Sequence, residues 1–75
     1  MTTKETLQAF EEKAPRVKTY LDSFKAARER AKEFPDADQI EKQLKAEIRG
    51  ALRALVLTEI ITASERKTLF IYYTL

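Results

Sequence analysis

Residues 36–61 read DADQIEKQLKAEIRGALRALVLTEII and form the longest uninterrupted helical pattern in the chain. Pro35 stands directly before this stretch and prevents a simple continuation of any preceding helix. Asp36 suits an N-cap, because its carboxylate can accept from the free N–H groups of a first helical turn. Gln39 follows three residues later, as in a capping box. We therefore predict that a long central helix begins after Asp36.

The central helix has an apolar side and a basic side. At about 100° per residue, six apolar residues fall on one stripe, which predicts a buried face. This apolar stripe consists of Ile40, Leu44, Ile48, Ala51, Leu52 and Leu55. Four cations fall on the opposite side and form what we call the basic stripe. It consists of Lys42, Lys45, Arg49 and Arg53.

A third band on the same helix carries small side chains, and we call it the small-residue band. It consists of Ala46, Gly50 and Ala54, continued by Leu57 and Ile61 if the helix persists that far. Glycine inside a helix costs about 1 kcal/mol relative to alanine, and close approach of another helix would compensate. We expect the band to pack against a helix, within the chain or in a partner. The alternative is that Gly50 is a tolerated surface residue.

Two helices are expected before the central one. Residues 2–14 begin with Thr2 and Glu5 at capping-box spacing, and Phe10 is the expected anchor of this short helix. Pro15 either starts a new helix or bends a longer one, and we favour a break or sharp bend. The second helix should cover residues 15–34 and lie antiparallel to the central helix, since their connection is short. Its expected apolar stripe consists of Val17, Tyr20, Leu21, Phe24, Ala27, Ala31 and Phe34.

The chain ends in a fourth helical segment that is unusually apolar. A turn is expected at residues 59–62, and Thr62 and Glu65 have capping-box spacing for a helix from about Ala63 towards Tyr73. One helix cannot bury all the large apolar residues of this segment on one face. We expect a second surface there, the C-terminal patch, although the sequence leaves open whether its aromatic residues are core or interface. The C-terminal patch consists of Phe70, Ile71, Tyr73 and Leu75.

The amino-acid composition predicts the fold class and excludes several kinds of catalytic and metal-binding site. Only 1 Gly and 2 Pro in 75 residues, with helix-forming residues dominant, predict an all-α fold. We expect a single helical domain over residues 1–75, a small antiparallel bundle of three to four helices. The absence of Cys and His removes disulfides, the usual zinc ligands and Ser-His-Asp or Cys-His catalysis. We therefore predict a non-enzymatic protein with no metal and no cofactor.

Segments for membrane insertion or export are not expected either. No apolar run approaches the roughly 20 residues that span a bilayer. The polar first residues, MTTKETLQAF, do not resemble a secretory signal. These features predict a soluble, cytoplasmic protein without a membrane span.

Two functions remain as hypotheses. In the first, the chain binds another protein through a helix face, as a regulator, inhibitor or immunity-like accessory protein, with a homodimer as one form of the same contact. The C-terminal patch and the small-residue band would carry this binding. In the alternative, the basic stripe contacts nucleic acid, although acidic residues share the helix and no aromatic residue lies between the cations. A cleft lined by Arg28, Arg49 and Arg53 could also hold an anion, although solvated side chains are the simpler interpretation.

Overall fold

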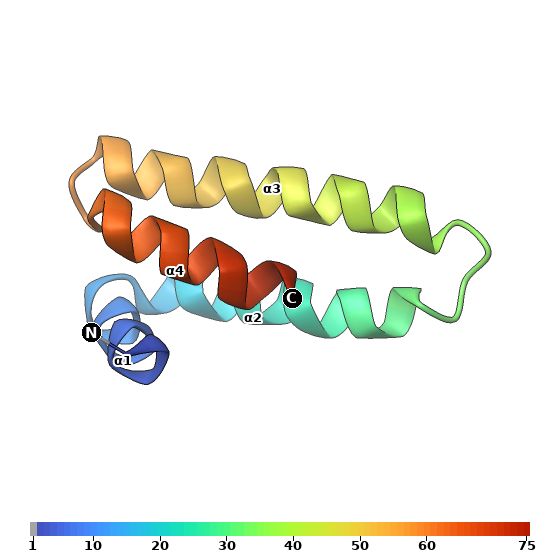
Figure 1. Cartoon of the computed structure of the whole chain (residues 1–75), viewed down its shortest axis with the longest axis horizontal. Helices are drawn as coiled ribbons and strands as arrows, with labels where there is room; N and C mark the ends of the chain where they lie inside the picture. The colour runs from blue at the N-terminus through green and yellow to red at the C-terminus, as the bar shows by residue number, and fades with distance from the viewer. Residues whose placement is uncertain (1) are drawn as a thin grey trace.

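The computed structural model describes residues 2–75, so only Met1 of the expected domain lies outside it. It contains the helices α1 (Thr3–Lys13), α2 (Pro15–Ala31), α3 (Ala37–Leu57) and α4 (Ala63–Thr74). Figure 1 shows α2 and α3 as a long antiparallel pair, with α4 along one half of the pair and α1 crossing its end. The described residues contain no strand. The predicted all-α antiparallel bundle is confirmed. None of these helices is both long and apolar enough to cross a membrane.

Local capping explains where α1 and α4 begin. The N–H of Glu5 donates to Thr2 Oγ1 at 3.1 Å, and Glu5 Oε1 accepts from the N–H of Thr2 at 3.2 Å. The N–H of Glu65 donates to Thr62 Oγ1 at 3.1 Å, and Glu65 Oε1 accepts from the N–H of Thr62 at 2.9 Å. Both predicted capping boxes are therefore formed.

The start of α3 differs from the expectation. Asp36 is the N-cap residue, but its side chain makes no capping hydrogen bond. Its backbone, at φ −101° and ψ 28°, is not in the extended region that aims a capping side chain at the first turn. The N–H of Gln39 instead donates to the main-chain oxygen of Asp36 at 3.1 Å. The capping box predicted for Asp36 and Gln39 is therefore wrong, although the position of the helix start is right.

Pro15 separates α1 from α2, which confirms the predicted break at this residue. Ala14 lies between them at φ −147° and ψ 66°, far from helical values, and Pro15 is the first residue of α2. Proline suits that position, since its missing N–H would have no partner in the first turn. Ala14 is itself buried, so the corner that redirects the chain is part of the core.

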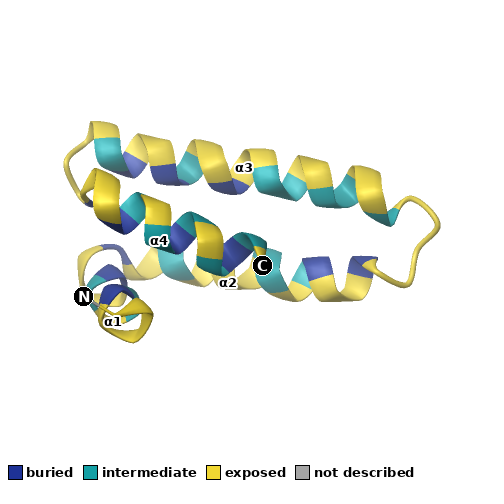
Figure 2. Ribbon diagram, viewed as in Figure 1, coloured by how far each residue is buried: buried dark blue, intermediate teal, exposed yellow. Residues whose placement is uncertain are grey.

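The core lies where α4 and α1 cover the α2–α3 pair (Figure 2). Its fully buried side chains are Phe10, Leu21, Ile48, Leu52, Leu69 and Tyr73. On α3, Ile48, Leu52 and Leu55 are buried, whereas Ile40 and Leu44 are only half-buried. Figure 1 gives the reason, because α4 stops before it reaches the α2–α3 turn. The predicted apolar stripe of α3 is thus correct, and its burial fades towards that turn.

The predicted stripe of α2 needs correction. Tyr20 is 53% exposed and Phe34 is 57% exposed, so neither belongs to the core. Arg28 is buried instead, at 8% exposure. Helical spacing places Arg28 directly between Phe24 and Ala31 on the inward face, which shifts the buried stripe away from Tyr20.

The end of α3 determines how far the small-residue band extends. The N–H of Ile60 donates to the main-chain oxygen of Leu55 at 2.9 Å, and the N–H of Glu59 donates to that of Val56 at 3.0 Å. This pair of bonds is the Schellman arrangement that closes many helices. It requires a left-handed residue, and Glu59 takes that conformation at φ 62°. The predicted turn at residues 59–62 is confirmed, and Ile61 lies beyond the helix rather than on the band.

Candidate partner-binding surfaces

The C-terminal patch is divided by the structure. Ile71 and Leu75 are 49% and 80% exposed, and Phe70 is half-buried. Tyr73 is 0% exposed, because it lies one turn after the buried Leu69 on the inward face of α4. Tyr73 is therefore a core residue and not part of an open patch.

Polar contacts hold the Tyr73 side chain inside the bundle. Its hydroxyl donates to Asp22 Oδ1 at 2.7 Å, and Asp22 Oδ2 accepts from Lys18 Nζ at 3.0 Å. Burial raises the pKa of Tyr73, and the hydrogen bond to the Asp22 carboxylate raises it further. Next to it, Lys25 Nζ lies 3.7 Å from the centre of the Tyr72 ring. These contacts close the seam between α2 and α4.

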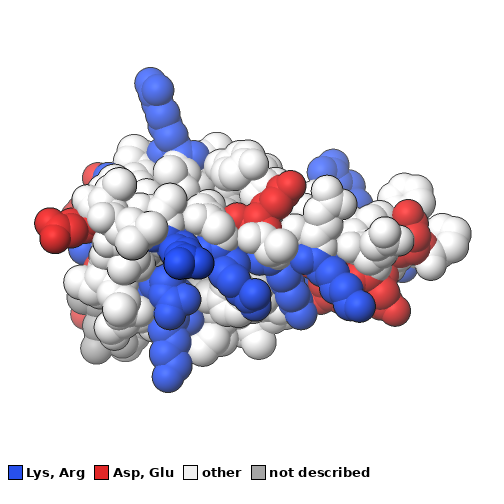
Figure 3. All heavy atoms as spheres, turned by 90° about the horizontal axis from the view of Figure 1, so that it is seen from above, with Lys and Arg blue, Asp and Glu red and all other residues white. Residues whose placement is uncertain are grey.

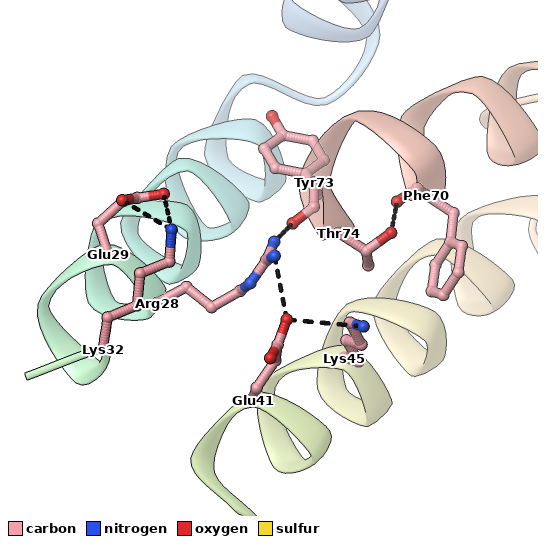
Figure 4. A network of polar contacts seen from close by, with 8 residues as sticks. All are labelled: Arg28, Glu29, Lys32, Glu41, Lys45, Phe70, Tyr73 and Thr74. Carbon is pink, nitrogen blue, oxygen red and sulfur yellow. Dashed lines mark hydrogen bonds and ion pairs between the residues drawn. The ribbon is translucent and has the colours of Figure 1, made fainter. Parts of the chain in front are cut away.

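Arg28 joins three helices (Figure 4). Its Nη1 donates to the main-chain oxygen of Tyr73 at 2.9 Å, and its Nη2 donates to Glu41 Oε1 at 3.1 Å. Lys45 Nζ approaches the same Glu41 oxygen at 3.6 Å. Arg28 was a candidate for anion binding. Its guanidinium group, however, already donates hydrogen bonds to Glu41 on α3 and to Tyr73 on α4. Its role is structural.

A groove remains open beside the outer face of α4, and we call it the α1–α4 groove. Its volume is about 200 Å³, and Ile71 and Leu75 provide its most exposed apolar surface. It is lined by Thr3, Thr68, Ile71, Tyr72 and Leu75. The two exposed members of the C-terminal patch therefore face one shallow cavity.

The small residues of the small-residue band do not pack within the chain. A Cβ added to Gly50 would meet no atom within 4 Å, so Gly50 faces open space. Ala46 and Ala54 are exposed, Leu57 is 74% exposed, and Ile61 is buried at 4% exposure. Of the two expected ways of covering Gly50, packing within this chain is not observed. That a partner covers the rest of the band stays a prediction.

The basic stripe opens onto a second groove, the α3–α4 groove. It has a volume of about 400 Å³ and is lined by Arg49, Arg53, Val56, Leu57 and Arg66. Arg66 comes from α4 and was not in the predicted stripe. The capping box of Thr62 and Glu65 predicts where α4 begins. Only the fold, however, brings α4 beside the last turns of α3. Figure 3 shows basic side chains following one another along this face of the molecule.

The cations of this face differ in their pairing. Lys45 is half-buried and pairs with Glu41, whereas Lys42 is exposed. Among residues 2–75, no ion pair involves Arg49, Arg53 or Arg66. The α3–α4 groove therefore carries three uncompensated guanidinium groups.

The buried carboxylate of Glu65 joins the start of α4 to α1. The N–H of Thr62 lowers the pKa of Glu65, and Lys13, whose Nζ lies 2.9 Å from both carboxylate oxygens, lowers it further. Within the described part of the chain, no three acidic or metal-ligating side chains gather into a potential metal site.

Two grooves on the surface are therefore the candidate binding sites. The α1–α4 groove offers apolar area, and the α3–α4 groove offers apolar area beside positive charge. Comparisons with protein-family models, with curated proteins and with solved structures give no match for this chain.

Proposed function

We propose that this chain is a small non-enzymatic accessory protein that binds another protein through the α1–α4 groove. The observation that carries the proposal is the exposure of Ile71 and Leu75, at 49% and 80%, beside a cavity of about 200 Å³. Contiguous exposed apolar surface on a small protein is typical of an interaction site. The effect on the partner would be occlusion or scaffolding, as expected of a regulator or inhibitor.

The position of these two residues suits a helical partner. Ile71 lies on α4 and Leu75 is the residue that directly follows the helix, four positions later. This spacing of one turn places their side chains close together. An amphipathic helix placed beside such a pair buries its own apolar stripe against it. The backbone beneath is fixed, since Arg28 holds the last turn of α4 and Tyr73 is bonded to Asp22. A surface that is already ordered loses little entropy on binding.

A second copy of this chain is one form that the partner can take. Light scattering behind a sizing column distinguishes the cases, because a homodimer doubles the mass at high protein concentration. The double variant Ile71→Ser, Leu75→Ser should remain monomeric if the α1–α4 groove forms the dimer. A monomer at all concentrations excludes the homodimer and leaves a different protein as the proposed partner.

Affinity capture with matched variants tests the proposal itself. Deleting residues 70–75 would also remove Tyr73 from the core, so point variants are required. The double variant Ile71→Ser, Leu75→Ser should lose a partner that the unaltered chain retains. Phe34→Ser is the control, since Phe34 is 57% exposed but lies in the α2–α3 turn. A partner held equally by the double variant, or lost equally by the control, would contradict the assignment to this groove.

A further inference from the structure

The α3–α4 groove lies on a different side of α4 from the α1–α4 groove and combines charge with apolar surface. Arg49, Arg53 and Arg66 surround it, and Val56 and Leu57 complete its lining. From this combination we infer a second binding surface, whose occupant is an acidic amphipathic helix of a partner protein.

Charge complementarity selects an acidic occupant. Three guanidinium groups from two helices line one cavity, and no carboxylate of residues 2–75 forms an ion pair with any of them. Arginine presents a planar fork of donors that matches a carboxylate in bidentate geometry. Charges at a groove also gain strength when a partner excludes water from it. The groove is therefore suited to ligands that carry several negative groups.

The apolar part of the groove favours a protein over nucleic acid. Leu57 is 74% exposed, and Val56 beside it is half-buried. A sugar–phosphate strand offers no apolar side chain for this surface, whereas the apolar stripe of an amphipathic helix does. Non-specific binding of single strands also uses aromatic residues that stack on bases. The nearby Phe70 is half-buried, and the guanidinium carbon of Arg49 already lies 5.4 Å from its ring centre.

Spacing along α3 fits a helical occupant. Arg49, Arg53 and Leu57 follow one another at four-residue intervals, about 6 Å apart along the axis. Glutamates at i and i+4 of a partner helix have the same separation, and a leucine at i+8 would reach Leu57. Arg66 approaches from α4 and would contact the opposite flank of that helix. The recognised chemistry is thus two acidic turns followed by an apolar anchor.

Fluorescence anisotropy with defined probes tests this inference. The first probe is a labelled synthetic helical peptide with Glu at i and i+4 and Leu at i+8, and the second replaces both Glu by Gln. The third and fourth are labelled single-stranded and duplex DNA. Each is titrated with the full chain at about 50 mM and about 300 mM salt, because screening weakens charge pairing at the higher ionic strength. We expect the acidic peptide to bind roughly tenfold more tightly than the Gln peptide at low salt.

Substitutions of residues outside the buried core locate the contact. Arg53→Gln combined with Arg66→Gln should weaken the acidic peptide roughly tenfold or more, and Leu57→Ser several-fold. Arg16→Gln is the control, since Arg16 is equally cationic but lies exposed on α2, and it should leave binding unchanged. Thermal melts followed by circular dichroism confirm that each variant is folded.

Three outcomes would overturn the inference. Equal binding of the two peptides, or no binding of either at about 1 mM, removes the acidic helix. DNA binding that needs Arg53 and Arg66 but is unchanged by Leu57→Ser assigns the groove to nucleic acid. Peptide binding that is lost in Ile71→Ser, Leu75→Ser but kept in the arginine variant moves the contact to the α1–α4 groove. That last result would leave the proposed function standing while this inference fails.

Discussion

Arg28 donates a hydrogen bond to the main-chain oxygen of Tyr73 at 2.9 Å, which ties the last turn of α2 to the last turn of α4. The final carbonyl groups of a helix have no partner within the helix, and they carry its partial negative charge. A buried guanidinium satisfies one of them here and neutralises part of that charge. The same side chain reaches Glu41 on α3, so one residue connects three helices.

Replacing Arg28 should therefore loosen the whole bundle. We expect Arg28→Ala to lower the free energy of unfolding by about 3 kcal/mol, since it loses two charge-assisted hydrogen bonds and the packing of its stem. Arg28→Met keeps most of that packing and should cost about 1 kcal/mol. Urea unfolding followed by circular dichroism measures both values. Two variants as stable as the unaltered chain would show that the network contributes nothing.

Tyr73 should produce a loss of stability in alkaline solution. Its pKa in the fold is raised above the ordinary value of 10.0, chiefly by burial. In the unfolded chain tyrosine ionises near pH 10, whereas the folded chain keeps the proton to higher pH. Its contribution is therefore complete below about pH 10 and declines as the pH rises further. The pKa of Lys18 is also raised, by its bond to Asp22, so it contributes in the same direction.

Tyr73→Phe isolates the tyrosine part of this effect. The variant should lose about 1 kcal/mol at neutral pH, because the bond to Asp22 is gone. Above about pH 10 its stability should fall less steeply than that of the unaltered chain. Tyr20→Phe is the control, since Tyr20 is 53% exposed and should leave the slope unchanged. Identical slopes for Tyr73→Phe and the unaltered chain would contradict the prediction.

Glu65 should produce the corresponding loss in acid. Its pKa in the fold lies below the ordinary value of 4.5, first through the N–H of Thr62 and then through Lys13. The stabilisation is therefore present above that value and lost as the pH falls through the lowered pKa. Glu65→Gln keeps an acceptor for the capping box but not the ion pair. It should cost about 1 kcal/mol at neutral pH and flatten the acid limb of a denaturation series, whereas Glu12→Gln, at an exposed site, should do neither.

The elements that sequence alone predicts are those set by local chemistry. Each capping box satisfies backbone N–H groups within one helical turn, so it can be predicted from the spacing of two residues. The two pairs are Thr2 with Glu5 and Thr62 with Glu65. Pro15 is equally local, because its ring fixes its own conformation and restricts that of its neighbour. The order and approximate bounds of all four helices follow from such signals. The all-α fold class and the antiparallel arrangement of α2 and α3 were predictable for this reason.

Which candidate residues are exposed depends on how far each helix is rotated about its own axis. Helical periodicity alone does not predict that rotation. Tyr73 and Ile71 both look suited to an interface, but the fold turns one inward and the other out. Arg28 resembles a solvated cation until α4 places a carbonyl oxygen beside it. Arg66 joins the predicted Arg49 and Arg53 only because α4 folds back along α3. Long-range packing settles each of these placements.

Glu59 occupies a position that favours glycine. Its φ of 62° is left-handed, and a residue with a Cβ pays roughly 1 kcal/mol or more for it. Glu59→Gly should therefore raise the free energy of unfolding by about 1 kcal/mol. Glu59→Ala retains the Cβ and should give no such increase. A decrease with glycine would show that the Glu59 side chain stabilises the turn in a way that outweighs its strain.

Gly50 gives the sharpest test of the small-residue band. It lies in the middle of α3, and a methyl group at its Cβ position would meet no atom within 4 Å, so alanine fits without a clash. Gly50→Ala should raise the free energy of unfolding by about 1 kcal/mol, since glycine is the weaker helix former. Ala46→Gly, at another exposed site on the same band, should lower it by a similar amount. If Gly50→Ala instead destabilises the chain increasingly as protein concentration rises, a second copy approaches the band closely, and the free surface of α3 is an interface after all.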